Sequence, residues 1–587
     1  MQAVFGLLHK PGSGSISAMN PPPGSLLAGL AMCMAVHVMA QEVPFSVTVT
    51  VRNKITARID DRLFGQFMER PSGGERGPES VVDQTTGTLP PPVMDLLQKM
   101  AIPVIRFPGG TDVDYMDWRD MVSNVPDRAA ERPVSTGNNG KNVTNRFGFD
   151  EYFALRDKLH CQTILVVNFL DAAAKKRPLE EAALNAAGLV AYANAPAGAQ
   201  LPPGMPDWPA VRAKNGHPAP FGIEYIQIGN EVWIERFRTA VKGGAAITDP
   251  QKMAAWWLEC YRTYIGAIRK VDPKIPIIID GNMGDGVEKS VLADPYIRQN
   301  VQYVTLHKYA PGATDKLTLD GAAYPPEKMR PEDWWYAWVA MPGKFSATGE
   351  CLGFGPHADL TDLGYKVVCT EWNWNGSGYK RMTPPPTVSH YLASGLGAAG
   401  FLQGMMRSGN GIEMATQSML VGSGWDIASI KVDPAGVKAP YFHPQGNVTM
   451  FYNLHHGSRM LQADIAGVAT YKQPFTVGWG SPVEKVAYVD ITTTAMDKCV
   501  YVHVINRDMK RPCHLSVDLA SIGATSGAAT LHVLNGPLEI EDQPPESLML
   551  EESRSVVQPA KNAVEADVPA HSVSIIEIPM VSVVTLK

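Results

Sequence analysis

The stretch IEYIQIGNE, residues 223 to 231, is an almost wholly apolar run that ends in an amide and a carboxylate. A short apolar run without polar alternation is typical of a strand buried on both faces of a parallel sheet. An ionised carboxylate at the end of such a strand is unfavourable unless partners or chemistry keep it there. Glu231 is therefore the residue whose role the rest of the chain has to explain.

Similar apolar runs recur between residues 60 and 430, separated by segments with apolar residues at three- and four-residue steps. They are LFGQFM (63–68), IPVIRFPGG (102–110), QTILVVNF (162–169), IPIIIDG (275–281), VQYVTLHKY (301–309), YKVVCTEWN (365–373) and, more weakly, GIEMATQSM (411–419). Strands that alternate with helices in this way indicate an α/β fold, and eight repeats predict a (β/α)8 TIM barrel with long loops. An open doubly wound sheet is the alternative, disfavoured because no GxGxxG follows the first strand.

The hydrophobic pattern of the sequence changes near residue 440, where alternating strands separated by turn residues replace the helical periods. This pattern predicts an antiparallel β-sandwich. VPFSVTVTVRNKIT (43–56) has the same alternation and is expected to pair with it. We therefore expect an N-terminal strand over 41–57 that joins the sandwich, the barrel over 58–435 and the sandwich domain over 436–587.

The first forty residues contain a short apolar run, SLLAGLAMCMAVHVMA (25–40), that ends in a small-residue cleavage pattern before Gln41. The run is too short to span a membrane, so residues 1–40 are interpreted as a signal peptide and the protein is expected to be secreted or periplasmic. The translation start stays open, with Met19 as an alternative to Met1. Cys499 and Cys513 flank an expected hairpin, either as a cross-link or as free thiols.

The composition excludes several classes of protein. The chain has 587 residues, 45% of them hydrophobic and 19% charged, which is typical of a globular protein with at least two domains. A net charge of -6 leaves no basic field for nucleic acid, so an uncharged polymer is the better partner. No motif implies a cofactor, and no histidine spacing implies a metal. The oligomeric state stays open.

Polar residues gather at the ends of the predicted strands. In a β/α barrel these ends form the reacting face, so side chains distant in the chain can converge there. Glu231 ends strand four and Glu371 ends strand seven, on opposite sides of the barrel mouth. Two convergent carboxylates with different surroundings can act as a proton donor and a nucleophile, the arrangement that glycoside hydrolysis requires.

At these residues the chain resembles family 51 of the glycoside hydrolases, the α-L-arabinofuranosidases and related enzymes. The resemblance covers roughly residues 45 to 455 and rests on motifs in order. They include FGQFMER, IPVIRFPGGTDVDYMDWRD, VRAKNGHPAPFGIEYIQIGNE, LHKY and VVCTEWN. It implies a retaining hydrolase with Glu231 as acid/base and Glu371 as nucleophile. It also implies a carbohydrate substrate held by Glu69, Asn230, His307 and Tyr309; Trp233 is predicted to line the same site.

Two departures from the family pattern fall in the predicted sugar site. Thr111 stands where the family has an Asn, and Met419 stands where it has a Gln, with Gln417 two residues earlier. Thr111 and Gln417 are retained as predicted substrate-binding residues. Trp334, Trp335 and Trp338 are expected either to stack on sugars or to pack a loop. Two other functions stay open: an endo-acting β-glycanase on glucan or xylan, and a non-catalytic carbohydrate-binding protein.

Overall fold

The computed structural model describes residues 45–70, 82, 88–234, 237, 241–242, 245–340, 344–345, 351–353, 358–376, 388–408, 411–424, 427–433, 435–478, 483–538 and 550–583. The signal peptide expected over 1–40 lies outside these residues. Among the helices of the described residues, none combines the length and the apolar character needed to cross a membrane.

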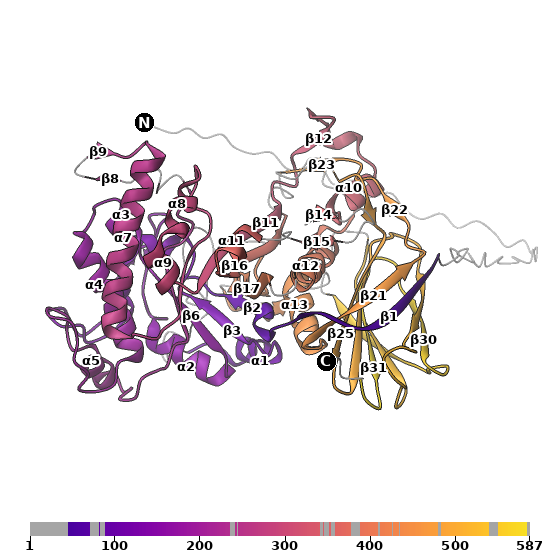
Figure 1. Ribbon diagram of the computed structural model, residues 1–587, viewed down its shortest axis with the longest axis horizontal. Coiled ribbons are helices and arrows are strands. Elements are labelled where there is room, and N and C mark those ends of the chain that lie inside the picture. The colour runs from indigo at the N-terminus through magenta and orange to yellow at the C-terminus, as the bar shows by residue number, and fades with distance from the viewer. Residues whose placement is uncertain are drawn as a thin grey trace, which may run out of the picture. The chain divides into compact units, whose positions relative to one another are not determined.

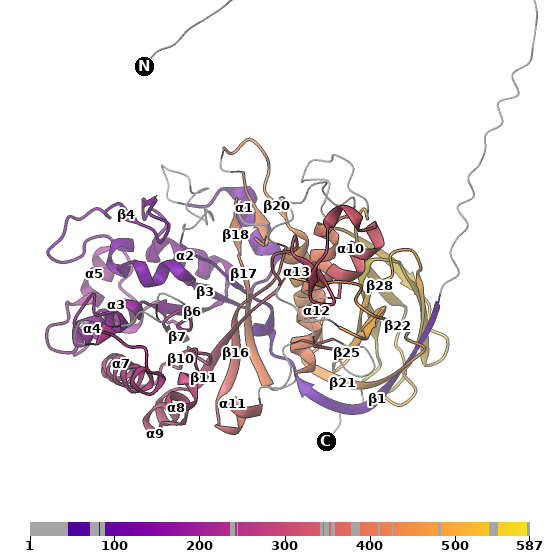
Figure 2. The ribbon, with the colours of Figure 1, turned by 90° about the horizontal axis from the view of Figure 1, so that it is seen from above.

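Eight parallel strands close into a barrel, which confirms the predicted fold class. In chain order they are β2 (Gly65–Phe67), β3 (Val104–Phe107), β6 (Gln162–Val167), β7 (Tyr225–Ile228), β10 (Ile277–Asp280), β11 (Tyr303–Pro311), β16 (Lys366–Asn375) and β17 (Ile412–Ser418). Each overlaps one of the eight predicted runs, and β11 and β16 extend two residues beyond theirs. The helices between the strands lie outside the barrel (Figures 1 and 2). The longer ones are α1 (Pro91–Lys99), α2 (Phe149–Leu159), α4 (Leu179–Asn194), α7 (Pro250–Val271), α12 (His390–Arg407) and α13 (Pro444–Leu454).

The longest of these helices, α7, shows how the sequence sets its boundaries. Asp249 caps its start by accepting hydrogen bonds from the backbone N–H groups of the first turn, and Pro250 occupies the first helical position. Met253, Trp257 and Tyr261, at four-residue steps, are buried on one face of the helix. The helix therefore has a fixed beginning and one apolar face for the barrel.

One end of the barrel is filled by side chains and the other carries the polar residues. Seven strands each contribute one member of an apolar cluster: Val104, Ile164, Tyr225, Ile278, Tyr303, Val368 and Met414. Most of these lie near the beginnings of their strands, so the layer blocks that end of the barrel. The chain can then present polar groups only at the opposite end, where the strands finish.

The C-terminal region forms a nine-stranded sheet in the order β29-β28-β31-β26-β25-β21-β1-β27-β30. Its edge strands contact each other, so the sheet encloses one apolar core as a sandwich does. The N-terminal strand β1 (Phe45–Arg58) lies inside this sheet, antiparallel to β21 (Arg459–Ala466) and parallel to β27 (Cys513–Asp518). In Figure 1 this indigo strand runs among the orange and yellow ones.

The hairpin expected around residues 499 to 513 is wrong. β26 (Cys499–Asn506) pairs with β25 (Val489–Met496) and β31 (Ser572–Pro579), while β27 pairs with β1 and β30 (Ala563–Val568). Three strands therefore separate Cys499 from Cys513, and both cysteines are free thiols. The alternating pattern identifies strands but does not say which strands are neighbours.

A buried ion cluster joins helix α12 to the nine-stranded sheet. Asp490, on β25, has no exposed surface and lies between two guanidinium groups. Arg407, at the end of α12, donates to its Oδ1, and Arg507 donates to its Oδ2 at 3.2 Å. The positive groups hold the pKa of Asp490 below its usual value despite burial, which opposes this shift. The cluster therefore couples helix α12 of the barrel to the sheet.

Asp490→Asn should destabilise the protein strongly. It leaves two buried guanidinium groups without their counter-charge, a change that typically costs about 3–5 kcal/mol. We expect the midpoint of thermal or denaturant unfolding to fall accordingly. The matched control is Asp464→Asn on β21, whose ion pair with Arg52 is about half exposed. That change should cost less than about 1 kcal/mol, and equal losses in both variants would contradict a special role for Asp490.

Candidate active site

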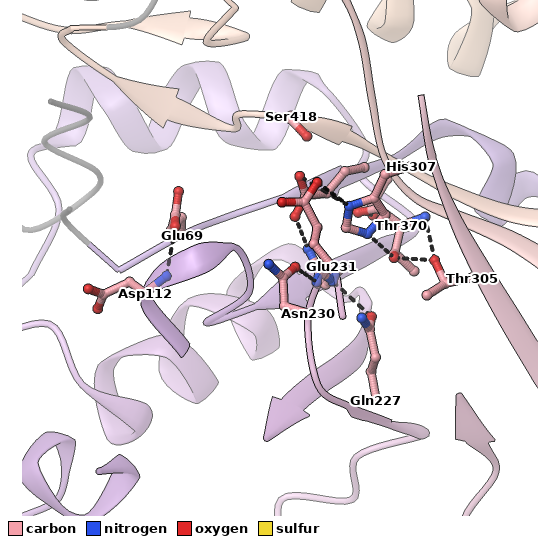
Figure 3. A network of polar contacts seen from close by, with 12 residues as sticks. Glu69, Asp112, Gln227, Asn230, Glu231, Thr305, His307, Thr370 and Ser418 are labelled. Carbon is pink, nitrogen blue, oxygen red and sulfur yellow. Dashed lines mark hydrogen bonds and ion pairs between the residues drawn. The ribbon is translucent and has the colours of Figure 1, made fainter. Parts of the chain in front are cut away.

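Glu231 is placed by a sharp turn of the backbone at the end of β7. Gly229 and Glu231 both have positive φ angles, 82° and 49°. A non-glycine residue in the left-handed region costs roughly 1–2 kcal/mol and is often found at functional sites. The next residue, Val232, donates its backbone N–H to Asp280 Oδ2 at 3.2 Å, which fixes the turn. The strained conformation aims the Glu231 carboxylate into the barrel mouth (Figure 3).

Glu371 lies within β16 and is 6% exposed. Arg106 Nη1 donates to its Oε1 at 2.8 Å, and the Tyr309 hydroxyl lies 2.9 Å from its Oε2. The Tyr309 hydroxyl also lies 2.7 Å from Ser418 Oγ. A phenol has one proton, so donation to the carboxylate requires the Ser418 hydroxyl to donate to Tyr309. Glu371 is thus held by one charged and one neutral donor.

The two glutamates converge on His307. Its Nδ1 lies 3.2 Å from Glu231 Oε1 and 3.5 Å from Glu371 Oε2. One oxygen of each carboxylate and this nitrogen all lie within 4.8 Å of one another. Retaining glycosidases have their two carboxyl groups about 5–5.5 Å apart, whereas inverting enzymes separate them by about 6.5–9.5 Å. The short separation therefore fits the retaining arrangement.

The ring of His307 is oriented from behind. Its Nε2 lies 3.1 Å from Thr370 Oγ1, and this hydroxyl contacts that of Thr305 in turn. Trp233 is half-buried and packs edge-on against the ring, with centroids 5.3 Å apart. The predicted Trp233 therefore lies beside the glutamate pair, and its contact within the described residues is to His307.

Arg106 connects several parts of the site and was not among the predicted substrate-binding residues. It has no exposed surface, and its guanidinium carbon lies 4.8 Å above the ring of Phe67. Besides Glu371, it donates to Gln227 Oε1 at 2.9 Å and to Asn230 Oδ1 at 2.7 Å. The sequence offered one signal that Arg106 belongs to the site, namely a single arginine inside the otherwise apolar run VIRF.

Glu69 and Thr111 lie on a neighbouring part of the barrel mouth. Figure 3 shows Glu69 apart from Glu231 and beside the backbone of Asp112, whose nitrogen is 3.5 Å from Glu69 Oε1. A Cβ on Gly110 would lie 2.2 Å from Glu69 Oε1, and Gly110 has a φ of 75°. Only glycine allows this approach, so the residue before Thr111 sets the position of Glu69.

Gln417 is brought near the site but not into it. It is fully buried, and its side chain bonds Gln66, Ser429 and the backbone oxygen of Gln445. These contacts lie behind the barrel mouth, which does not support the predicted sugar contact. The adjacent Ser418 instead contacts Tyr309, and Met419 packs in a small apolar cluster that includes Phe67.

Two other polar side chains near the strand ends, Asp112 and Asn168, hold loops together. Asp112 pairs with Arg70, and Asn168 donates to the backbone oxygen of Met116 at 3.1 Å. The three tryptophans of the 332–338 segment lie in α10 (Pro331–Trp338) and are at most 3% exposed. Trp335 donates to the backbone oxygen of Arg507 in the sheet region at 2.7 Å. They therefore serve packing rather than stacking on sugars.

The site offers one possible place for a cation among the described residues. Glu231, His307 and Glu371 have ligand-like spacing. However, the Arg106 guanidinium already lies 2.8 Å from Glu371 and neutralises it. The arrangement is therefore better suited to moving a proton between the carboxylates than to holding a metal.

Asp280, at the end of β10, is a second buried acid beneath Glu231. It has no exposed surface, and no hydrogen bond from the described residues reaches its Oδ1. Burial raises its pKa to about 7. An unfolded aspartate has a pKa near 3.9, so the folded state binds this proton more tightly. Its contribution to stability is then greatest below about pH 4 and is lost as the pH rises to about 7.

Asp280→Asn should remove this pH dependence. The variant should gain stability relative to the natural protein as the pH rises from 5 to 8, by about 2–3 kcal/mol, because the asparagine never has to be ionised in the interior. Urea unfolding at both pH values measures the difference. The control is Asp285→Asn at an exposed position, which should show no such trend. A gap between Asp280→Asn and the natural protein that stays constant with pH would contradict the assignment.

Comparison with known sequences shows that part of the chain is similar to arabinofuranosidases. Residues 96–315 match the family model of the α-L-arabinofuranosidase 1 domain. An intracellular exo-α-(1→5)-L-arabinofuranosidase of Streptomyces lividans is 27% identical to this chain, in a match that covers 43% of this chain and 35% of that enzyme. The enzyme of the same name from Halalkalibacterium halodurans is 22% identical, in a match that covers 79% of this chain and 85% of that enzyme.

The predicted secreted or periplasmic location is contradicted by these relatives, because both are named as intracellular enzymes. The prediction rested on one short apolar run with a small-residue ending. Such a run is defined by hydrophobicity alone, which other apolar segments share. The interpretation of residues 1–40 as an export signal is therefore withdrawn.

Comparison with solved structures concerns the fold. A family 51 α-L-arabinofuranosidase from Bifidobacterium longum matches with a TM-score of 0.67 at 16% identity, over 91% of this chain and 100% of that one. This match concerns the fold, while the family model and the two relatives concern the sequence. Together they confirm the resemblance that the motifs predict: this is a protein similar to the family 51 α-L-arabinofuranosidases.

Proposed function

We propose that the protein is a retaining glycoside hydrolase that releases α-L-arabinofuranosyl residues from a carbohydrate. The carrying observation is that Glu231 and Glu371 converge within 4.8 Å in different surroundings. The relatives named above act as exo-α-(1→5)-L-arabinofuranosidases, which supports the substrate class. An endo-acting β-glycanase shares the barrel fold, but no contact in the described site favours it.

In the proposed reaction Glu371 attacks the anomeric carbon. Arg106 and Tyr309 orient its carboxylate and stabilise the negative charge that the nucleophile must carry. The glycosyl–enzyme bond forms as the bond from the anomeric carbon to the leaving oxygen breaks. Water then attacks the same carbon and returns Glu371 to its free carboxylate.

Glu231 is the proposed acid/base. Its side chain is 20% exposed, more than that of Glu371 at 7%, so water can reach it. It gives a proton to the leaving oxygen in the first step and removes one from the attacking water in the second. His307, which lies between the two carboxylates, positions Glu231 through its Nδ1.

The sugar is proposed to bind through Glu69 and Asn230. Because Asn230 Oδ1 accepts from Arg106, its amide NH2 is the half that can donate to a sugar hydroxyl. Thr111 supplies a single hydroxyl where relatives of this type carry an amide, and Met419 supplies no hydrogen-bonding group of comparable strength. The sugar site is therefore expected to make fewer polar contacts at these two positions than the family pattern does.

The proposal is tested with 4-nitrophenyl α-L-arabinofuranoside and the variants Glu371→Ala and Glu231→Ala. Each should lower turnover by several orders of magnitude, because each removes a group that makes or breaks a bond. Added azide should restore turnover in both. The product should keep the anomeric configuration of the substrate in Glu231→Ala, where two displacements occur, and invert it in Glu371→Ala, where one occurs.

The matched control is Glu224→Gln, at the opposite end of the same strand region, where the carboxylate accepts from the backbone N–H of Thr163. It should retain turnover. NMR of the azide products assigns the roles. The opposite pattern of configurations would exchange the roles of Glu231 and Glu371, and near-natural turnover in either alanine variant would refute the mechanism.

Tyr309→Phe should lower kcat while leaving KM nearly unchanged. The variant removes a donor to the nucleophile, and a hydrogen bond to a charged group contributes about 1.5–3 kcal/mol, or roughly 10- to 150-fold in rate. Tyr303→Phe is the control, because Tyr303 donates to Glu413 at 2.9 Å at the other end of the barrel. Equal effects of the two changes on kcat would show that Tyr309 acts through stability alone.

A further inference from the structure

A second cluster of ligand-type side chains lies where helix α13 meets the nine-stranded sheet, away from the glutamate pair. His455 caps the C-terminal end of α13. His532 lies on β28 (Ala529–Asn535) and Glu577 on β31. Thr530 is paired with Glu577, so His532 and Glu577 are diagonal neighbours on one face of the sheet. Three elements distant in the chain thus supply one side chain each.

The distances within this cluster fit a shared metal ion. Glu577 Oε2 lies 3.3 Å from His455 Nδ1 and 3.5 Å from His532 Nε2. All three atoms lie within 4.8 Å of one another. Ligand atoms placed tetrahedrally at the usual 2.0–2.1 Å from Zn²⁺ lie about 3.3–3.4 Å apart. Both nitrogen–oxygen distances are close to this separation.

A neighbouring carboxylate fixes the tautomer of His532. Its Nδ1 lies 3.2 Å from Glu552 Oε1, which as a carboxylate can only accept a hydrogen bond. Nδ1 therefore carries a proton, and the neutral form of the ring directs its Nε2 lone pair toward the Glu577 oxygen. This nitrogen makes no hydrogen bond, although the residue is only 4% exposed. In this form two electron-pair donors face each other, a repulsion that a metal ion between them removes.

The surroundings also suit a metal. A carboxylate that accepts from the second nitrogen of a ligand histidine is the usual outer partner in metal sites. The side chains of His455 and Glu577 are 14% and 36% exposed, which gives an entry path and room for a water ligand. Arg554 Nε donates a hydrogen bond to Glu552 Oε1 at 2.6 Å.

We propose that His455, His532 and Glu577 bind one divalent transition-metal ion of the zinc type, with water in the remaining position. The ion would tie the end of α13, which follows the last barrel strand, to two strands of the sheet. Its role is therefore structural and separate from the proposed hydrolase reaction. Glu552 acts as the outer partner that orients His532.

The test uses the full chain freed of metal with a chelator and titrated with Co²⁺, whose visible absorption reports tetrahedral coordination, and then with Zn²⁺ as competitor. We expect one ion per chain at this site and a rise in the unfolding temperature on binding. His455→Gln and Glu577→Gln should each weaken binding at least about 100-fold, and Glu552→Gln about 10- to 100-fold. Glu577→Gln changes a partly exposed side chain, so it keeps the test valid if a histidine variant fails to fold.

Two controls locate the ion. His514→Gln removes an exposed histidine that pairs with Asp567 on the same sheet, and it should bind Co²⁺ as the natural protein does. His307→Gln alters the other cluster with similar spacing and should also retain the signal. No cobalt spectrum in the natural protein would overturn the proposal. A spectrum that survives Glu577→Gln and His455→Gln but disappears in His307→Gln would overturn it as well.

Discussion

The buried guanidinium of Arg106 is the interaction on which the candidate site depends. Desolvation of such a group costs several kcal/mol unless each donor finds a partner. Here its nitrogens donate to Glu371, Gln227 and Asn230. The residues that satisfy the cation come from or follow strands β7 and β16, so the same contacts that make burial tolerable also fix two polar side chains at the barrel mouth.

Most of the barrel could be predicted from the sequence because a strand buried on both faces has a local signature. Each of the eight predicted runs overlaps one barrel strand, and the helical periods between them correspond to helices. The sheet region was predicted less completely. Alternation defines which residues share a face of a strand, but pairing depends on contacts distant in the chain. The N-terminal strand β1 lies beside β27, so β26 and β27 cannot form the local hairpin that their spacing suggested.

The candidate site was predictable to the extent that barrel geometry gathers strand ends. That rule brought together Glu231, Glu371, His307 and Tyr309 from three separate runs. The rule does not say on which side of a strand a given side chain lies, and here a shift of one residue decides this. Neighbouring residues of a strand point to opposite sides, so Ser418 contacts Tyr309 while Gln417 is buried behind it. Their sequence spacing alone could not distinguish the two.

Two clusters of this protein each combine histidine and glutamate at nearly equal spacing, yet their hydrogen bonds imply different chemistry. The far nitrogen of His307 faces the hydroxyl of Thr370, which can donate or accept, so either tautomer is allowed and Nδ1 can hold a proton between the carboxylates. The far nitrogen of His532 faces the carboxylate of Glu552, which only accepts. In its neutral form that ring presents a lone pair to its neighbours. A proton suits the first arrangement and a metal ion suits the second. The hydrogen-bond partner of the far nitrogen of each histidine therefore separates the two functions, whereas the residue types around the near nitrogen do not.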